Sequence, residues 1–158
     1  MAPLIVLIVS TLAARLAGQL GARALRDWAA GTRAGLAIMF CFTASAHFSS
    51  MRADMIAMVP PGVPRPELMV TLTGVCEILG ASGLLVPRTR RLAAFALIVF
   101  LLAVLPANIH AARSGVTLRG APATPLVPRV ALQAFFIVLI WWSGARRTRG
   151  VDREAAGR

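Results

Sequence analysis

Two ionisable residues, His47 and Glu77, interrupt otherwise apolar stretches of this chain. An ionised glutamate in a hydrocarbon environment is strongly disfavoured, so Glu77 is expected to be either protonated or paired. A glutamate and a histidine with coupled protonation can pass protons to or from a reducible ligand such as a quinone. We therefore predict Glu77 and His47 as the catalytic residues, and a quinone is the cofactor that this chemistry suggests.

Other polar residues fall at the ends of neighbouring apolar segments. If these segments cross a bilayer, their polar groups lie in the same half of it and can surround a pocket with Glu77 as its floor. The predicted ligand-binding residues are Asn108, Gln133, His110 and Thr73. The alternative is a hydrogen-bonded clasp that only holds the helices together, and both interpretations stay open.

A stripe of soft ligands follows His47. Met51, Met55 and Met58 lie four, eight and eleven residues after it, which would place them on one face of a continuing helix. Histidine with thioethers could bind Cu(I), with His47, Met51 and Met55 as ligands. Methionine is also a flexible apolar filler in an interfacial helix. Our main prediction assigns no metal, and the copper site is kept as an alternative.

The composition is typical of a membrane protein. Of the 158 residues, 58% are hydrophobic and 15% are charged, whereas about 25% of the residues of an average soluble protein are charged. All 17 basic residues are arginines, and they form short clusters between the apolar segments. Such clusters suit lipid headgroups, and no recognition motif for nucleic acid accompanies them.

Five apolar segments approach the length of about 20 residues that crosses a bilayer. They span 4–22, 34–47, 68–86, 92–111 and 130–143, and the second and fifth are expected to extend to about 32–51 and 128–146. The predicted fold is therefore an all-α, polytopic transmembrane helical bundle. Gly74, Gly80 and Gly83 keep one side of the third segment small and favour close helix packing, and Pro106 is expected to kink the fourth.

The arginines predict the orientation of the bundle. Eleven of them follow the first, third and fifth segments, and five follow the second and fourth. Because positive charge favours the cytoplasmic side, the N-terminus is expected outside and the C-terminus inside. We predict one membrane domain over 1–158, with an N-terminal helix at about 4–22, a four-helix core at about 32–146 and a basic cytoplasmic tail at 147–158.

Several motifs occur together in a characteristic order: "HF", "MVPPGVP", "GVCEILGASGLLVPRTRRLAA" and "LPANIHAA". Over residues 33–146 the chain resembles the DoxX-like family of small bacterial membrane proteins. The resemblance implies a four-helix transmembrane core, to which the first helix is an addition. His47, Pro60, Pro61, Glu77, Pro106 and Asn108 occupy the positions that define the family pattern.

The resemblance implies two kinds of activity. One branch of the family is linked to thiosulfate:quinone oxidoreduction and oxidative stress, and distant relatives assist receptor assembly. The first hypothesis is thus a multi-pass protein of the bacterial inner membrane that acts as a membrane subunit in quinone-linked or thiol/sulfur redox chemistry, with a soluble or membrane redox partner. The rival is a non-enzymatic membrane scaffold or assembly chaperone. Association of several copies of the chain is left open.

Overall fold

The computed structural model describes residues 2–118, 120–122 and 125–145, so the predicted tail at 147–158 lies outside the described residues. The prediction of an all-α helical bundle is confirmed. The long helices are α1 (Ala2–Gln19), α2 (Trp28–His47), α4 (Pro66–Leu85), α5 (Arg90–Arg113) and α6 (Leu126–Ile140). The shorter elements are the 3₁₀ turn η1 (Arg23–Leu25), α3 (Arg52–Ala57), the strands β1 (Thr117–Leu118) and β2 (Ala121–Pro122), and the π-helical turn η2 (Trp141–Ala145), which continues α6.

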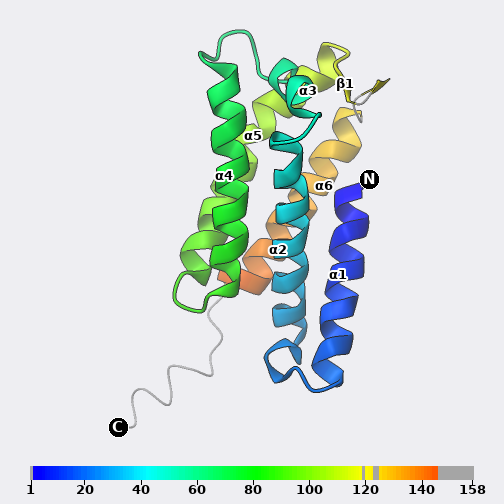
Figure 1. Cartoon of the computed structure of the whole chain (residues 1–158), viewed down its shortest axis with the longest axis vertical. Helices are drawn as coiled ribbons and strands as arrows, with labels where there is room; N and C mark the ends of the chain where they lie inside the picture. Colours follow the sequence, from blue (N-terminus) through cyan, green and yellow to red (C-terminus); the bar gives the residue numbers. More distant parts are fainter. Residues whose placement is uncertain (1, 119, 123–124, 146–158) are drawn as a thin grey trace.

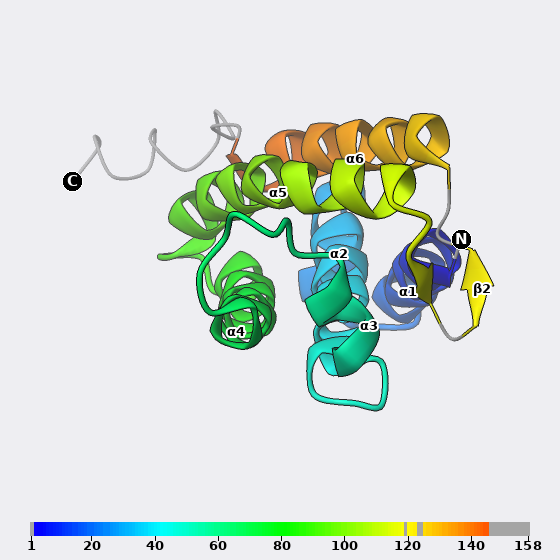
Figure 2. The same ribbon diagram turned by 90° about the horizontal axis from the view of Figure 1, so that it is seen from above.

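The helices form two layers (Figures 1 and 2). In one layer α2 lies between α4 and α1, while α5 and α6 lie side by side in the other layer and slant across it. Small residues permit the close packing of α4 on α5. A Cβ at Gly80 would overlap the side chain of Leu97, and one at Gly83 would lie 2.6 Å from Ala93 Cβ. The predicted role of these glycines in helix packing is confirmed.

The distribution of side chains is that of a membrane protein. Large apolar residues are exposed around the bundle, for example Val9, Leu79 and Val99 at 61%, 66% and 64% exposure. Glu77 and Gln133, in contrast, are buried inside it. An apolar outer surface is stable in lipid and not in water. Five helices are long and apolar enough to span a bilayer, and the chain is a multi-pass membrane protein.

Helix α2 begins and ends four residues earlier than the sequence suggested. Its start is set by Asp27, whose carboxylate caps the helix by accepting a hydrogen bond of 2.7 Å from the amide of Ala30. At its other end the serine hydroxyls of residues 45 and 49 bond to the carbonyls of Phe42 and Ala46. Such bonds compete with helix propagation, and the chain turns before α3 begins.

Arg33 is one of the eleven arginines counted for the cytoplasmic side, but it does not lie in a connection between helices. Arg33 lies inside α2, is only 9% exposed, and donates a hydrogen bond of 2.7 Å from one guanidinium nitrogen to the carbonyl of Ser143 in η2. The guanidinium therefore joins the beginning of α2 to the end of the α6–η2 segment. Because α2 begins at Trp28, Arg33 lies in the second turn of the helix rather than at its beginning.

The N-terminal helix packs on its own chain, alongside α2 (Figure 1). The contact is made by Gly31 and Gly35, which are four residues apart on one face of α2. A Cβ at Gly31 would lie 2.8 Å from Arg15 Cδ, and one at Gly35 would overlap the hydroxyl of Thr11. This spacing of small residues lets two helix backbones approach closely in a membrane.

Replacing Gly35 with leucine is expected to detach α1 from α2, because the new side chain needs the space that Thr11 occupies. Overpacking of this kind lowers the free energy of unfolding by about 1–3 kcal/mol. Hydrogen–deuterium exchange in detergent micelles is expected to increase over residues 2–19. Gly62→Leu is the control, because nothing lies within 4 Å of a Cβ there. Equal exchange in both variants would contradict the proposed packing role of Gly35.

Candidate functional site

The predicted pair, His47 and Glu77, lies where α2 packs against α4. His47 is the last residue of α2, Glu77 is in the middle of α4, and they are 5% and 8% exposed. Gly74, one turn before Glu77, makes the imidazole fit, because a Cβ at this position would lie 2.7 Å from His47 Cβ. The glycine thus provides the space in which the two ionisable groups meet.

The hydrogen bonds of His47 determine which of its ring nitrogens carries a proton. Nδ1 lies 2.8 Å from the carbonyl oxygen of Val70. Because a carbonyl oxygen only accepts, Nδ1 must be the donor. The hydroxyl of Thr73, a predicted ligand-binding residue, lies 3.2 Å from the same nitrogen. The other nitrogen, Nε2, lies 3.7 Å from Oε1 of Glu77.

This geometry leaves one proton to be shared by His47 and Glu77. With Nδ1 already protonated, the next proton is either on Nε2, facing an ionised carboxylate, or on the carboxyl group, facing a neutral imidazole. Both states avoid an isolated charge in the membrane interior. The contact between α2 and α4 can therefore hold this proton on either of the two side chains.

Thr43 is a member of this site that the sequence analysis missed. Its hydroxyl lies 2.8 Å from Oε2 of Glu77 and 3.1 Å from the carbonyl of Phe40. It can donate a hydrogen bond to an ionised Glu77, or donate one to Phe40 and accept one from the O–H of a neutral Glu77. Thr43 lies one helical turn before His47, and this i, i+4 spacing was the signal that could have identified it.

Arg52 was also missed as a structural residue, since it was counted only as a charge that sets orientation. Its guanidinium donates hydrogen bonds of 3.0 Å to the carbonyls of His47 and Glu67, and one of 2.9 Å to the hydroxyl of Thr71. It therefore joins the end of α2 to the first turns of α4. We expect this arrangement to limit movement of the His47 backbone.

Asn108 and Gln133 form a second polar group, between α5 and α6. The amide nitrogen of Asn108 donates to Oε1 of Gln133 at 3.3 Å, and Arg129 donates to Oδ1 of Asn108 at 2.9 Å. The amide of Gln133 in turn donates to the carbonyl of Leu101. The next carbonyl along the chain, that of Leu102, lacks its usual amide partner because the residue four positions later in α5 is Pro106.

The single pocket expected around Glu77 would bring Asn108 close to it, but the two residues belong to different polar groups. Within the described part of the chain, the hydrogen bonds of Asn108 run to α6, and those of Glu77 to α2. Asn108 and Gln133 lie on the adjacent helices α5 and α6, so their amide groups find hydrogen-bond partners there without reaching α4. The role of Asn108 and Gln133 in orienting a ligand stays a prediction.

Among the residues that the structure describes, His110 takes no part in the hydrogen bonds of either group. It is in the last turn of α5, and its Nδ1 lies 3.2 Å from the hydroxyl of Ser114, the residue that follows the helix. This local contact satisfies the imidazole near a helix end. Its predicted role in ligand binding remains untested by the geometry.

The expected continuous helix carrying the methionine stripe is wrong. α2 ends at His47, and Met55 belongs to the separate helix α3. The imidazole of His47 is engaged by Val70 and Glu77 of α4. The i, i+4, i+8 face on which the copper alternative depended is thus lost. Among the described residues, no group of three or more His, Cys, Asp or Glu side chains could hold a metal ion.

No curated protein and no solved structure matches this chain. Its residues 36–144, however, match a family model described as a domain of unknown function, DUF8561. The matched range contains both polar groups, the whole of α4, α5 and α6, and most of α2, and it excludes α1. The match covers more than half of the chain, which therefore belongs to the DUF8561 family.

Proposed function

We propose that this protein is a DoxX-like membrane subunit that exchanges protons with a reducible ligand in quinone-linked or thiol/sulfur redox chemistry. The observation that carries the proposal is the buried His47–Glu77 pair, in which Val70 holds Nδ1 protonated and Nε2 faces the carboxylate. A pair that holds one mobile proton at a membrane-embedded position suits proton transfer coupled to reduction.

The proposed chemistry balances with a quinone as the ligand. Reduction of a quinone to a quinol takes up two electrons and two protons. The electrons would come from a soluble or membrane redox partner, and the protons would pass through Glu77 and His47. Thr43 can accompany either protonation state of Glu77 because its hydroxyl both donates and accepts.

The location that we propose is the bacterial cytoplasmic membrane, with the N-terminus outside. The arginine distribution supports this orientation. Arg23 and Arg26 lie in the connection between α1 and α2, and Arg88 lies in that between α4 and α5. These connections are at the same end of the bundle (Figure 1). The buried position of Arg33 removes it from the headgroup charge and leaves the excess on that side.

Native mass spectrometry of protein extracted from its own membranes tests the proposal. A bound mass matching a quinone is expected in the wild type and at least tenfold less of it in Glu77→Gln, which keeps the size of the side chain but cannot ionise. Glu67→Gln is the matched control, because Glu67 is on the same helix with an exposed side chain. Retention of the quinone by Glu77→Gln, or its absence from the wild type, would contradict the proposal.

A scaffold or assembly chaperone is the second candidate, and a specific observation favours it. The side chains of Asn108, Gln133 and Thr73 all hydrogen-bond to neighbouring helices or to their own backbone. A clasp that fixes helix packing has this arrangement. Under this alternative, Glu77→Gln reduces the thermal stability, no small molecule accompanies the purified wild type, and another polypeptide does.

A further inference from the structure

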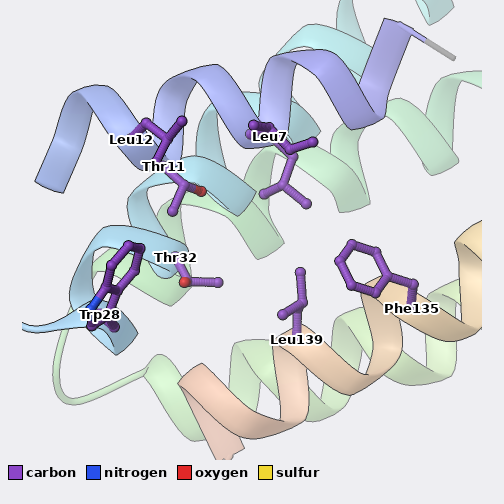
Figure 3. Close-up of a pocket in the computed structure, with 8 residues that line it drawn as sticks. Leu7, Thr11, Leu12, Trp28, Thr32, Phe135 and Leu139 are labelled. Atoms are coloured by element: carbon purple, nitrogen blue, oxygen red, sulfur yellow. The ribbon is translucent and has the colours of Figure 1, made fainter.

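An apolar groove lies between α1 and α6, with the beginning of α2 as its floor (Figure 3). Its volume is about 200 Å³. Leu7 and Leu12 of α1 lie opposite Phe135 and Leu139 of α6, and the indole of Trp28 closes one end. The hydroxyls of Thr11 and Thr32 and the indole N–H of Trp28 are the polar side-chain groups of its lining, and the other lining side chains are apolar, so an apolar occupant fits it best.

The groove exists because α1 packs on α2 and not on α6. Gly31 and Gly35 have no side chain and let α1 pack closely on α2. The walls formed by α1 and α6 are separated in Figure 3. The apolar walls gain dispersion contacts when apolar atoms lie between them. A space with such walls does not attract water. Since α1 lies outside the range matched by the family model, one wall is an addition to the shared domain.

Positive charge is concentrated at the Trp28 end of the groove. The guanidinium carbon of Arg15 lies 4.7 Å from the centre of the Trp28 ring, and Arg15 also donates to the carbonyls of Leu25 and Arg26. Arg23 and Arg26 are exposed on the same connection. The acidic residue there, Asp27, is engaged as the cap of α2. Tryptophan with arginine marks the headgroup level of a membrane, where arginine binds phosphate.

We propose that this groove binds one acyl chain of an anionic phospholipid, whose phosphate group contacts Arg23 and Arg26. Apolar walls next to a connection with a net positive charge match the two parts of such a lipid. A neutral quinone tail would also suit the walls but would make no use of the charge. The lipid fills the space between α1 and the α6 wall and thereby couples the N-terminal helix to the shared four-helix domain.

Native mass spectrometry after delipidation and reloading tests this site, with phosphatidylglycerol and phosphatidylcholine of identical acyl chains as probes. The wild type is expected to retain phosphatidylglycerol in preference to phosphatidylcholine by roughly tenfold. The double variant Arg23→Gln/Arg26→Gln is expected to lose the preference, whereas Arg91→Gln, an exposed arginine outside the groove, keeps it. Equal retention of the two lipids by the wild type would overturn the proposal.

Filling the groove tests the position of the acyl chain. Leu139→Trp is expected to reduce retention of phosphatidylglycerol at least fivefold. Leu12→Trp, at a half-exposed position of the opposite wall, is expected to do the same even if the first variant folds poorly. Unchanged lipid retention in a folded Leu12→Trp protein would contradict the proposal that the acyl chain binds in this groove. Loss of a co-purifying quinone from this variant, with phosphatidylglycerol unaffected, would assign the groove to the quinone instead.

Discussion

Replacement of His47 with leucine is expected to destabilise the bundle more than any other single change in the α2–α4 contact. The variant loses the hydrogen bond to the carbonyl of Val70 and leaves Glu77 with Thr43 as its partner. Hydrogen bonds between membrane helices contribute about 0.6 kcal/mol on average and up to about 1.7 kcal/mol. Glu77 must then either be neutral or remain an unpaired buried charge, and both cost free energy, so we expect the free energy of unfolding to fall by about 2 kcal/mol.

A double-mutant cycle separates the pair from its surroundings. Unfolding in detergent micelles, followed by circular dichroism, gives the stabilities of His47→Leu, Glu77→Leu and the combined variant. The combined variant is expected to lose about 1–2 kcal/mol less than the sum of the two single losses, because residues in contact are not additive. Such a coupling would demonstrate that the two side chains interact across the 3.7 Å that separates them.

The second histidine provides the matched control for this cycle. His110 is near the end of α5 and bonds to Ser114, so His110→Leu and Glu77→Leu are expected to be additive within about 0.5 kcal/mol. Additivity in the His47 cycle as well would show that the Glu77 carboxyl gains nothing from the imidazole. The proton-sharing site would then have to be abandoned.

Replacement of Arg33 with methionine is expected to loosen the opposite end of the bundle. The change keeps the length of the side chain but removes the charged donor that satisfies the carbonyl of Ser143 at 2.7 Å. A hydrogen bond from a charged group contributes about 1.5–3 kcal/mol. We expect the free energy of unfolding to fall by about 2 kcal/mol, measured as for the His47 variants, and the exchange of amides near η2 to rise.

Arg91→Met is the control for Arg33, because Arg91 is an exposed arginine in the first turn of α5. Its effect is expected to stay within about 0.5 kcal/mol. An increase in the free energy of unfolding of Arg33→Met would also have a physical explanation. Arg33 lies within Coulombic range of Arg90, which carries the same charge, and burying a guanidinium is itself unfavourable. A more stable Arg33→Met protein would show that desolvation and repulsion outweigh the bond to Ser143.

The amino-acid sequence by itself determined the class of the fold. Apolar segments separated by arginines and prolines can satisfy their backbones in a bilayer only as helices, and the five predicted spans correspond to the helices observed. The sequence also identified His47 as a partner of Glu77, because an ionisable group within an apolar segment needs a polar partner on an adjacent helix.

Helix boundaries were less predictable, for local reasons. The Asp27 cap and the serine hydroxyls near His47 shift α2 by four residues relative to the expected range of 32–51. The earlier start places Arg33 in the second turn of α2, and the earlier end separates the methionines from the face of His47. Hydropathy averages over many residues, whereas a cap or a turn depends on one or two side chains.

Only the tertiary structure decided which polar groups meet. The pattern of polar residues suggested one pocket, but each polar group is satisfied by the helix packed closest to it, and this gives one cluster between α2 and α4 and another between α5 and α6. The packing of α1 on α2 likewise depends on the face that Gly31 and Gly35 present. Both outcomes follow from interhelical distances of a few ångströms, which depend on how all the helices pack together and cannot be obtained from the spacing of residues along one of them.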